Sequence, residues 1–190
     1  MRTSDRIGRR GALGLLAAAA LIAGPARAAA TDRATALVDS GKSEGQVYAG
    51  FEAILVRYAD MPAVAASVLG PPWRSAGAGQ KKAFVAAFQG YLARKYGAQF
   101  EDYRNASIEV TGAKDGGKAG VLVTSKVVRP GQQSVAVDWQ ISDRSGQVRV
   151  VNLVIEGVSM LATERAEIGA MLEAARGDLD VVTGQLEGRS

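Results

Sequence analysis

The spacing of apolar residues changes from a helical to a strand period about halfway along the chain. Between residues 43 and 100 apolar side chains recur every three to four positions, which predicts amphipathic helices. We expect three of them, over 43–58, 60–69 and 78–100. Asp60 is placed to cap the second helix, Pro62 falls in its first turn, and Gly70 with the two prolines after it ends the helix. This part of the chain is therefore predicted to be helical.

From Ser107 onward the apolar period is two, which is typical of strands. We expect strands over 107–111, 121–128, 134–141 and 147–158, separated by turns rich in Gly, Asp and Pro. In the third strand Val135, Val137, Trp139 and Ile141 alternate with polar residues, so the sheet should have one apolar face. Two adjacent valines, at 150 and 151, break the alternation of the fourth strand and predict a β-bulge that curves the sheet.

Helical spacing returns from Met160 and continues, with an interruption at Gly177, to Leu186. The pattern as a whole predicts an α+β fold. We expect a single domain in which amphipathic helices are followed by a curved antiparallel sheet of about four strands and by C-terminal helices. The helices should pack on the apolar side of the sheet and enclose an apolar pocket with it.

The N-terminal segment has the features of an export signal. Arg9 and Arg10 precede an apolar run over 12–24, and Ala26-Arg27-Ala28 then supplies a small-residue cleavage site. We interpret residues 1–28 as a secretory signal peptide, exported by the Sec or the twin-arginine route, and residues 29–190 as the mature domain in the periplasm. A permanent membrane anchor is the alternative, but the apolar run is short for a bilayer.

Charge and composition then narrow the chemistry. The net charge of +4 originates in the signal segment, which holds five of the 23 basic residues and one of the 19 acidic ones, so the remainder is balanced. Cys and His are absent from the sequence, which excludes disulfides, thiol and imidazole catalysis, and zinc sites built on these residues. No glycine-rich nucleotide-binding motif is present either.

Carboxylates remain as possible acid–base groups. The candidates are Glu101 with Asp102, Asp178 with Asp180, and Asp138 beside Trp139. Adjacent positions on a helix do not face one site, Asp178 has the position of a helix cap, and Asp138 falls on the polar face of its strand. We therefore interpret all of them as structural and expect a protein that is not an enzyme and that has no metal or cofactor.

Two pairs of neighbouring basic residues, Lys81-Lys82 and Arg94-Lys95, lie in the predicted long helix. Because the mature chain is neutral and Glu101, Asp102 and Glu109 lie nearby in sequence, we interpret these pairs as a solvated helix face. Docking of a partner on a basic patch is the alternative.

Several short motifs, in order along the chain, carry a family resemblance. These are Val68-Leu69-Gly70, Trp73-Arg74, the segment QKKAFVAAF over 80–88, the stretch 96–103, and Glu156-Gly157-Val158-Ser159-Met160. In this order and spacing the chain resembles the MlaC family, also called the toluene-tolerance family, of periplasmic phospholipid-binding proteins. The resemblance extends from about residue 60 to residue 186.

The resemblance implies a function and partners. Members of the family carry phospholipid between an inner-membrane ABC transporter complex with an MCE-domain subunit and an outer-membrane lipoprotein–porin complex, which maintains the lipid asymmetry of the outer membrane. It also makes Arg165 a candidate contact for the lipid head group, since the family has an Arg in the polar trio after its GVS element. Related members are associated with hopanoids, so a hopanoid is an alternative ligand.

A carrier needs a dry container, because the roughly 30 methylenes of a diacyl lipid would expose about 24 kcal/mol of apolar surface in water. We expect the acyl chains to lie against one side of the sheet and one face of the long helix. The predicted contacts are Phe84, Phe88, Tyr91, Leu92, Val121, Val123, Val135, Val137, Trp139, Val150 and Ile155. A strand phase shifted by one residue would instead select Leu122, Val151 and Leu153.

Two alternatives stay open at this point. A small periplasmic enzyme or binding protein for another apolar ligand would place a buried carboxylate or lysine inside the pocket. A structural adaptor would have helix and sheet side chains that meet and fill the core, with no pocket at all.

Overall fold

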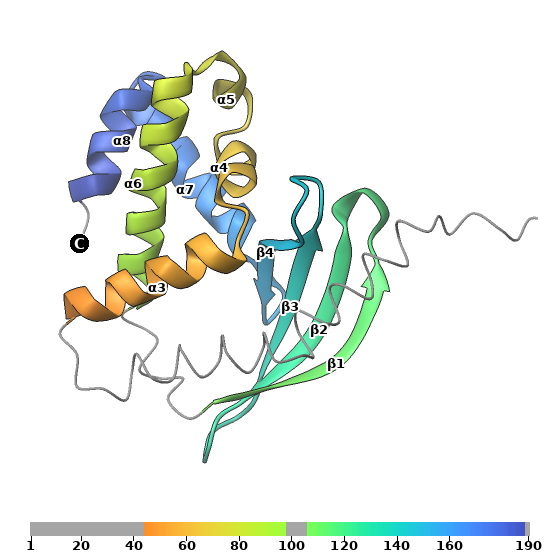
Figure 1. Cartoon of the computed structure of the whole chain (residues 1–190). Coiled ribbons are helices and arrows are strands. Elements are labelled where there is room, and N and C mark those ends of the chain that lie inside the picture. Colours follow the sequence, from red (N-terminus) through yellow and green to blue (C-terminus); the bar gives the residue numbers. More distant parts are fainter. Residues whose placement is uncertain (1–43, 98–105, 189–190) are drawn as a thin grey trace, which may run out of the picture.

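The computed structural model describes residues 44–97 and 106–188 (Figure 1). The helices are α3 (Glu44–Tyr58), α4 (Met61–Leu69), α5 (Pro71–Ser75), α6 (Ala78–Gly97), α7 (Met160–Ala174) and α8 (Leu179–Gly188), with a short 3₁₀ turn, η2 (Gly117–Ala119). The strands are β1 (Ser107–Asp115), β2 (Val121–Val128), β3 (Val135–Ser142), β4 (Arg149–Ile155) and β5 (Val158–Ser159). The predicted α+β class is confirmed. The predicted signal peptide lies outside the described residues.

The helices form a layer of their own beside the sheet. Helix α4 begins as predicted, with the Asp60 carboxylate accepting a hydrogen bond of 3.1 Å from the Ala63 amide. It ends at Gly70, whose φ of +64° is a conformation that glycine adopts without a steric penalty. Helices α3, α4 and α8 pack against α6, and α7 packs against α4 and α8 (Figure 1).

The sheet is an antiparallel meander in the order β1-β2-β3-β4-β5. The fourth predicted strand is wrong in one respect, because the chain turns at Glu156 and Gly157 and forms a short fifth strand. These two residues have φ of +49° and +82°, the conformation that a tight hairpin turn requires. Ser159 then caps α7 by accepting a hydrogen bond of 3.2 Å from the Ala162 amide. The Glu156-to-Met160 motif is therefore a hairpin turn followed by a helix cap.

Helices and sheet are joined mainly along β4 and β5, whereas β1 lies farthest from the helices (Figure 1). At one end of β4 the Arg149 guanidinium donates hydrogen bonds of 2.7, 2.9 and 3.3 Å to the carbonyls of Val56, Arg57 and Ala59. These carbonyls lie at the C-terminal end of α3, where helix carbonyls have no partner within the helix. Farther along β4, the Asn152 side chain accepts a hydrogen bond of 3.0 Å from the Leu161 amide at the start of α7.

None of the described helices combines the length and the apolar composition that crossing a bilayer requires.

Candidate functional site

The apolar side of the sheet can be assigned from the strand register. Residues directly opposite in an antiparallel pair project from the same face. Val123 lies opposite Trp139, which lies opposite Leu153 on β4, and the neighbouring rows follow the same rule. We call this surface the apolar sheet face. Its members on the three central strands are Val121, Val123, Ser125, Val127, Val135, Val137, Trp139, Ile141, Val150, Leu153 and Ile155.

The predicted bulge in the fourth strand is confirmed and decides which of its residues share this face. Gln140 pairs with Asn152, but the next residue, Ile141, pairs with Val150, so Val151 is the extra residue. Val150 and Ile155 therefore lie on the same face although they are an odd number of positions apart. Leu153 is two positions before Ile155 and shares this face with it. It was not among the predicted contacts, because the prediction did not count alternate positions back from Ile155 to the bulge.

The apolar sheet face is only partly closed. Val123 is 1% exposed and Ile141 3%. In contrast, side chains at several other positions of the face are half-buried, namely Val135, Trp139, Val150, Leu153 and Ile155. Apolar surface that the fold leaves accessible is what a site for an apolar ligand requires.

Ser125 is the polar residue of this face on β2, and its hydroxyl both donates and accepts a hydrogen bond. The Trp139 indole N–H donates to the Ser125 hydroxyl at 2.8 Å, and that hydroxyl donates to the Val137 carbonyl at 2.9 Å. A buried hydroxyl without partners would cost free energy next to hydrocarbon. Because these bonds satisfy it, Ser125 does not interrupt the apolar character of the face.

The predicted contacts on the long helix lie elsewhere. Phe84, Phe88, Tyr91 and Leu92 belong to the core of the helical layer, together with residues of α4, α7 and α8. The rings of Phe84 and Phe88 stack with centroids 5.7 Å apart. The structural-adaptor alternative, in which this helix stripe and the sheet face meet and fill one core, does not fit the structure, because the buried sheet residues form a separate cluster around Val121, Val123 and Ile141. The neighbouring helices occupy the apolar side of α6 instead.

Arg165 lies in α7 beside the junction of α4 and α5. Its guanidinium approaches Gly70 so closely that a Cβ built on the glycine would lie 3.2 Å from the Nη2 atom. The side chain is exposed. Two features of the structure thus favour glycine at position 70 of the Val68-Leu69-Gly70 motif: its positive φ and the close approach of Arg165. Arg165 belongs to neither of the two hydrophobic clusters, and its contact with a head group stays a prediction.

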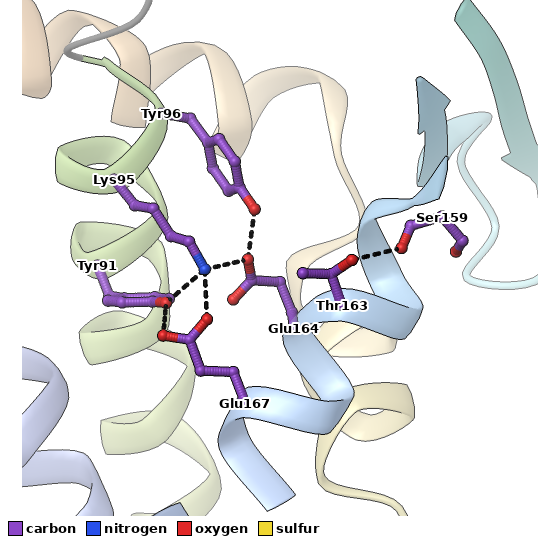
Figure 2. A network of polar contacts seen from close by, with 7 residues as sticks. All are labelled: Tyr91, Lys95, Tyr96, Ser159, Thr163, Glu164 and Glu167. Atoms are coloured by element: carbon purple, nitrogen blue, oxygen red, sulfur yellow. Dashed lines mark hydrogen bonds and ion pairs between the residues drawn. The ribbon is translucent and has the colours of Figure 1, made fainter. Parts of the chain in front are cut away.

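A network of polar side chains between α6 and α7 was not predicted (Figure 2). Lys95 binds Glu164 at 2.8 Å and Glu167 at 2.5 Å, and its ammonium also donates to the Tyr91 hydroxyl at 2.8 Å. The Tyr91 hydroxyl donates to Glu167, and the Tyr96 hydroxyl to Glu164. The interpretation of Lys95 as part of a solvated helix face is therefore wrong. The available signal was the spacing of Tyr91 with Lys95 and of Glu164 with Glu167, one helical turn apart.

The network shifts the titration of its members. Burial, with the hydrogen bond to Glu167 and the nearby charge of Glu164, raises the pKa of Tyr91 to about 12. Burial and the hydrogen bond to Glu164 also raise the pKa of Tyr96. Burial alone would lower the pKa of Lys95, but its hydrogen bonds to both glutamates outweigh that effect and raise it. At neutral pH the network thus contains an ammonium and two neutral phenols, and it stabilises the helical layer.

The carboxylates considered for acid–base chemistry have structural surroundings where the structure describes them. Asp178 accepts hydrogen bonds from the amides of Asp180 and Val181, which confirms it as a helix cap. Asp138 lies on the polar face of the sheet, opposite Thr124. Glu101 and Asp102 lie outside the described residues. Within 44–97 and 106–188, no three His, Cys, Asp or Glu residues are grouped so as to hold a metal ion.

Two open hollows of about 590 and 600 Å³ lie on the helical layer, one between α7 and α8 and one between α5 and the end of α7. Neither is lined by a residue of the sheet or by a predicted tail contact.

Comparison with known proteins places this arrangement in a family. A solved structure described as the phospholipid-binding protein from Ralstonia solanacearum, in complex with a phospholipid, is 20% identical in sequence and superposes with a TM-score of 0.71. The match covers 85% of this chain and 92% of that one, and it shows a shared fold. Residues 28–188 match the family described as MlaC protein. The chain therefore belongs to the MlaC family.

Proposed function

We propose that this protein is a carrier that binds a phospholipid with its acyl chains against the apolar sheet face. The observation that supports the proposal most directly is the contrast between a closed helical core and a sheet face whose valine, leucine, isoleucine and tryptophan side chains remain half-buried. Each methylene moved from water onto such a surface contributes about 0.8 kcal/mol. No group on the face needs to react with the ligand.

Membership in the MlaC family and the structural neighbour that holds a phospholipid support the same ligand class. In this proposal the protein works in the periplasm, exported by the signal at 1–28. It shuttles lipid between an inner-membrane ABC transporter with an MCE-domain subunit and an outer-membrane lipoprotein–porin complex. The head group remains near water, so selectivity for it should be weak. The predicted contacts on α6 act indirectly, by holding the helical layer together.

The proposal is tested by two substitutions on adjacent residues of one strand. Leu153→Asn places an amide on the apolar sheet face, whereas Val154→Asn changes the next residue, which pairs with Asp138 and Ser159 on the other side of the sheet. We expect Leu153→Asn to lower the phospholipid that is extracted from purified protein several-fold, because an amide without a partner is unfavourable against acyl chains.

Val154→Asn should retain the phospholipid content of the wild type. Circular dichroism of both variants checks that they are folded. Equal lipid content in folded Leu153→Asn and wild type would contradict the proposed position of the tails. If a hopanoid were recovered in place of phospholipid, the proposed site would stand but its ligand would be a hopanoid.

A further inference from the structure

The helices α4 to α6 contain basic residues without acidic ones. From Met61 to Gly97 the chain has no Asp or Glu, yet it has Arg74, Lys81, Lys82, Arg94 and Lys95. Two of these cations bind partners within the helical layer. Lys95 pairs with the two glutamates of α7, and Arg94 donates to carbonyl groups at the end of α8. The other three remain at α5 and the start of α6.

These three cations, in α5 and at the start of α6, are joined by Arg165 on α7. Arg74 and Lys82 are exposed, and the Lys81 ammonium lies 5.6 Å from the centre of the Trp73 ring. Arg165 reaches the same helix from α7, at Gly70. Among residues 44–97 and 106–188, none of the four cations forms an ion pair. We call Trp73, Arg74, Lys81, Lys82 and Arg165 the α5 patch.

Acidic groups near the α5 patch do not cancel its charge. Asp180 accepts a hydrogen bond of 3.0 Å from Gln80, at the start of α6. Glu173 lines the hollow beside Pro72, but Arg176 lines the same hollow. Asp178 caps α8 with its carboxylate. These three acidic residues keep their charge, but the four cations of the patch and Arg176 outnumber them. The end of the helical layer that carries α5 is therefore a net positive surface (Figure 1).

We propose that the α5 patch is a docking surface for an anionic phospholipid bilayer. A tryptophan among lysines and arginines is the composition of segments that lie at membrane interfaces, where the ring sits at head-group depth and the cations bind lipid phosphates. Each basic residue close to an anionic surface strengthens binding about fivefold at low salt. Four such residues give weak, reversible attachment, which a carrier needs to leave the membrane again. The patch is separate from the apolar sheet face and does not depend on the proposed position of the tails.

The test measures co-sedimentation of the full chain with phosphatidylcholine vesicles that do or do not contain phosphatidylglycerol. The test variant is the double substitution Arg74→Gln/Lys82→Gln, which removes two exposed charges. The matched control is Lys114→Gln/Lys118→Gln, which removes two exposed charges from the region of β1 and η2. We expect the test variant to bind anionic vesicles about 25-fold more weakly than the wild type at low salt, and the control to bind like the wild type.

High salt should reduce the difference between test variant and control, since the attraction is electrostatic. Three results would overturn the proposal: no preference of the wild type for anionic vesicles, equal binding by the test variant and the wild type, or equal losses in the two double variants. The first of these would leave an acidic protein as the partner of the patch. Because lipid extraction from the same variants measures the sheet face separately, the failure of one proposal is distinguishable from the failure of the other.

Discussion

The helical layer and the sheet contain similar apolar residues but use them differently. In the helical layer Phe84, Phe88, Ile168, Val182 and Leu186 are all completely buried, and apolar residues of α4, α6, α7 and α8 pack around them. On the sheet, a few valines and Ile141 are buried while the side chains beside them stay half-buried. The first region stabilises the fold, and the second retains apolar surface that a ligand can cover. This difference is the reason that we propose the lipid site on the sheet.

Substitutions at two isoleucines, one in each region, should give the largest difference in the free energy of unfolding. Ile168 on α7 is 0% exposed, whereas Ile155 on the apolar sheet face is half-buried. We expect Ile168→Ala to lower the free energy of unfolding by about 4 kcal/mol, and Ile155→Ala by about 1 kcal/mol, because only the first leaves a closed cavity. Urea denaturation of lipid-free protein measures both. Equal losses would mean that the sheet face is as tightly packed as the helical core.

The polar network gives a smaller effect within the helical layer. Lys95→Met removes the charged partner of Glu164 and leaves the hydrogen bond from Tyr96. Glu164 is 3% exposed and has one carboxylate oxygen without a hydrogen bond. We expect a loss of about 2 kcal/mol in the free energy of unfolding, since a buried carboxylate loses a charged partner. The variant should keep the lipid content of the wild type when it is folded. A folded variant that is depleted of lipid would connect the network to the site.

Alkaline pH should also weaken the polar network, through ionisation of Tyr91. The pKa of Tyr91 is raised from 10.0 to about 12, so the folded protein keeps this proton where the unfolded chain loses it. Its contribution to the free energy of unfolding is complete below pH 10 and is lost as the pH rises to about 12. Tyrosinate absorbance and urea denaturation across this range should show late ionisation and falling stability. In Tyr91→Phe the decline should be smaller, and an unchanged decline would exclude Tyr91 as its source.

The junction between the two regions should give the smallest change in stability. Arg149 joins β4 to the end of α3 through three carbonyls. Arg149→Gln should lower the free energy of unfolding by about 1 kcal/mol, the usual contribution of such hydrogen bonds. It should also speed the loss of bound lipid to acceptor vesicles, because α3 is then held less firmly against the sheet.

Arg144→Gln is the control for this junction, since Arg144 binds the Lys118 carbonyl, away from the helices. Arg149→Lys should recover part of the wild-type rate of lipid loss. If Arg149→Gln and Arg144→Gln released lipid at the same rate, the junction would have no role in retention.

The sequence predicts local structure well because local structure depends on nearby residues. The Asp60 cap, the bounds of β2 and the bulge at residues 150 and 151 follow from spacing and side-chain chemistry, and all are confirmed. The turn at Glu156 and Gly157 was missed, because Val154, Ile155 and Val158 continue an apolar run across it. The predicted phase of β2 and β3 is confirmed, but on β4 Leu153 shares the face of Trp139 and was expected there only for a shifted phase.

What the sequence did not predict depends on contacts between distant segments. An apolar stripe on a helix must be buried, but its period does not say by which element, so Phe84 and Phe88 were expected to face the sheet. Lys95 meets Glu164 and Glu167 across about 70 residues of chain, and no local pattern distinguishes such a lysine from an exposed one. The position of the candidate site relative to the helices therefore emerged only from the tertiary structure.

If the apolar sheet face holds the acyl chains of a phospholipid, the lipid should stay with the protein during purification without detergent. Mass spectrometry of the organic extract from such protein measures this. We expect a stoichiometric amount of phospholipid, with several head groups represented. Protein that is folded and repeatedly free of any lipid, although it was purified from cells with intact membranes, would contradict the proposal.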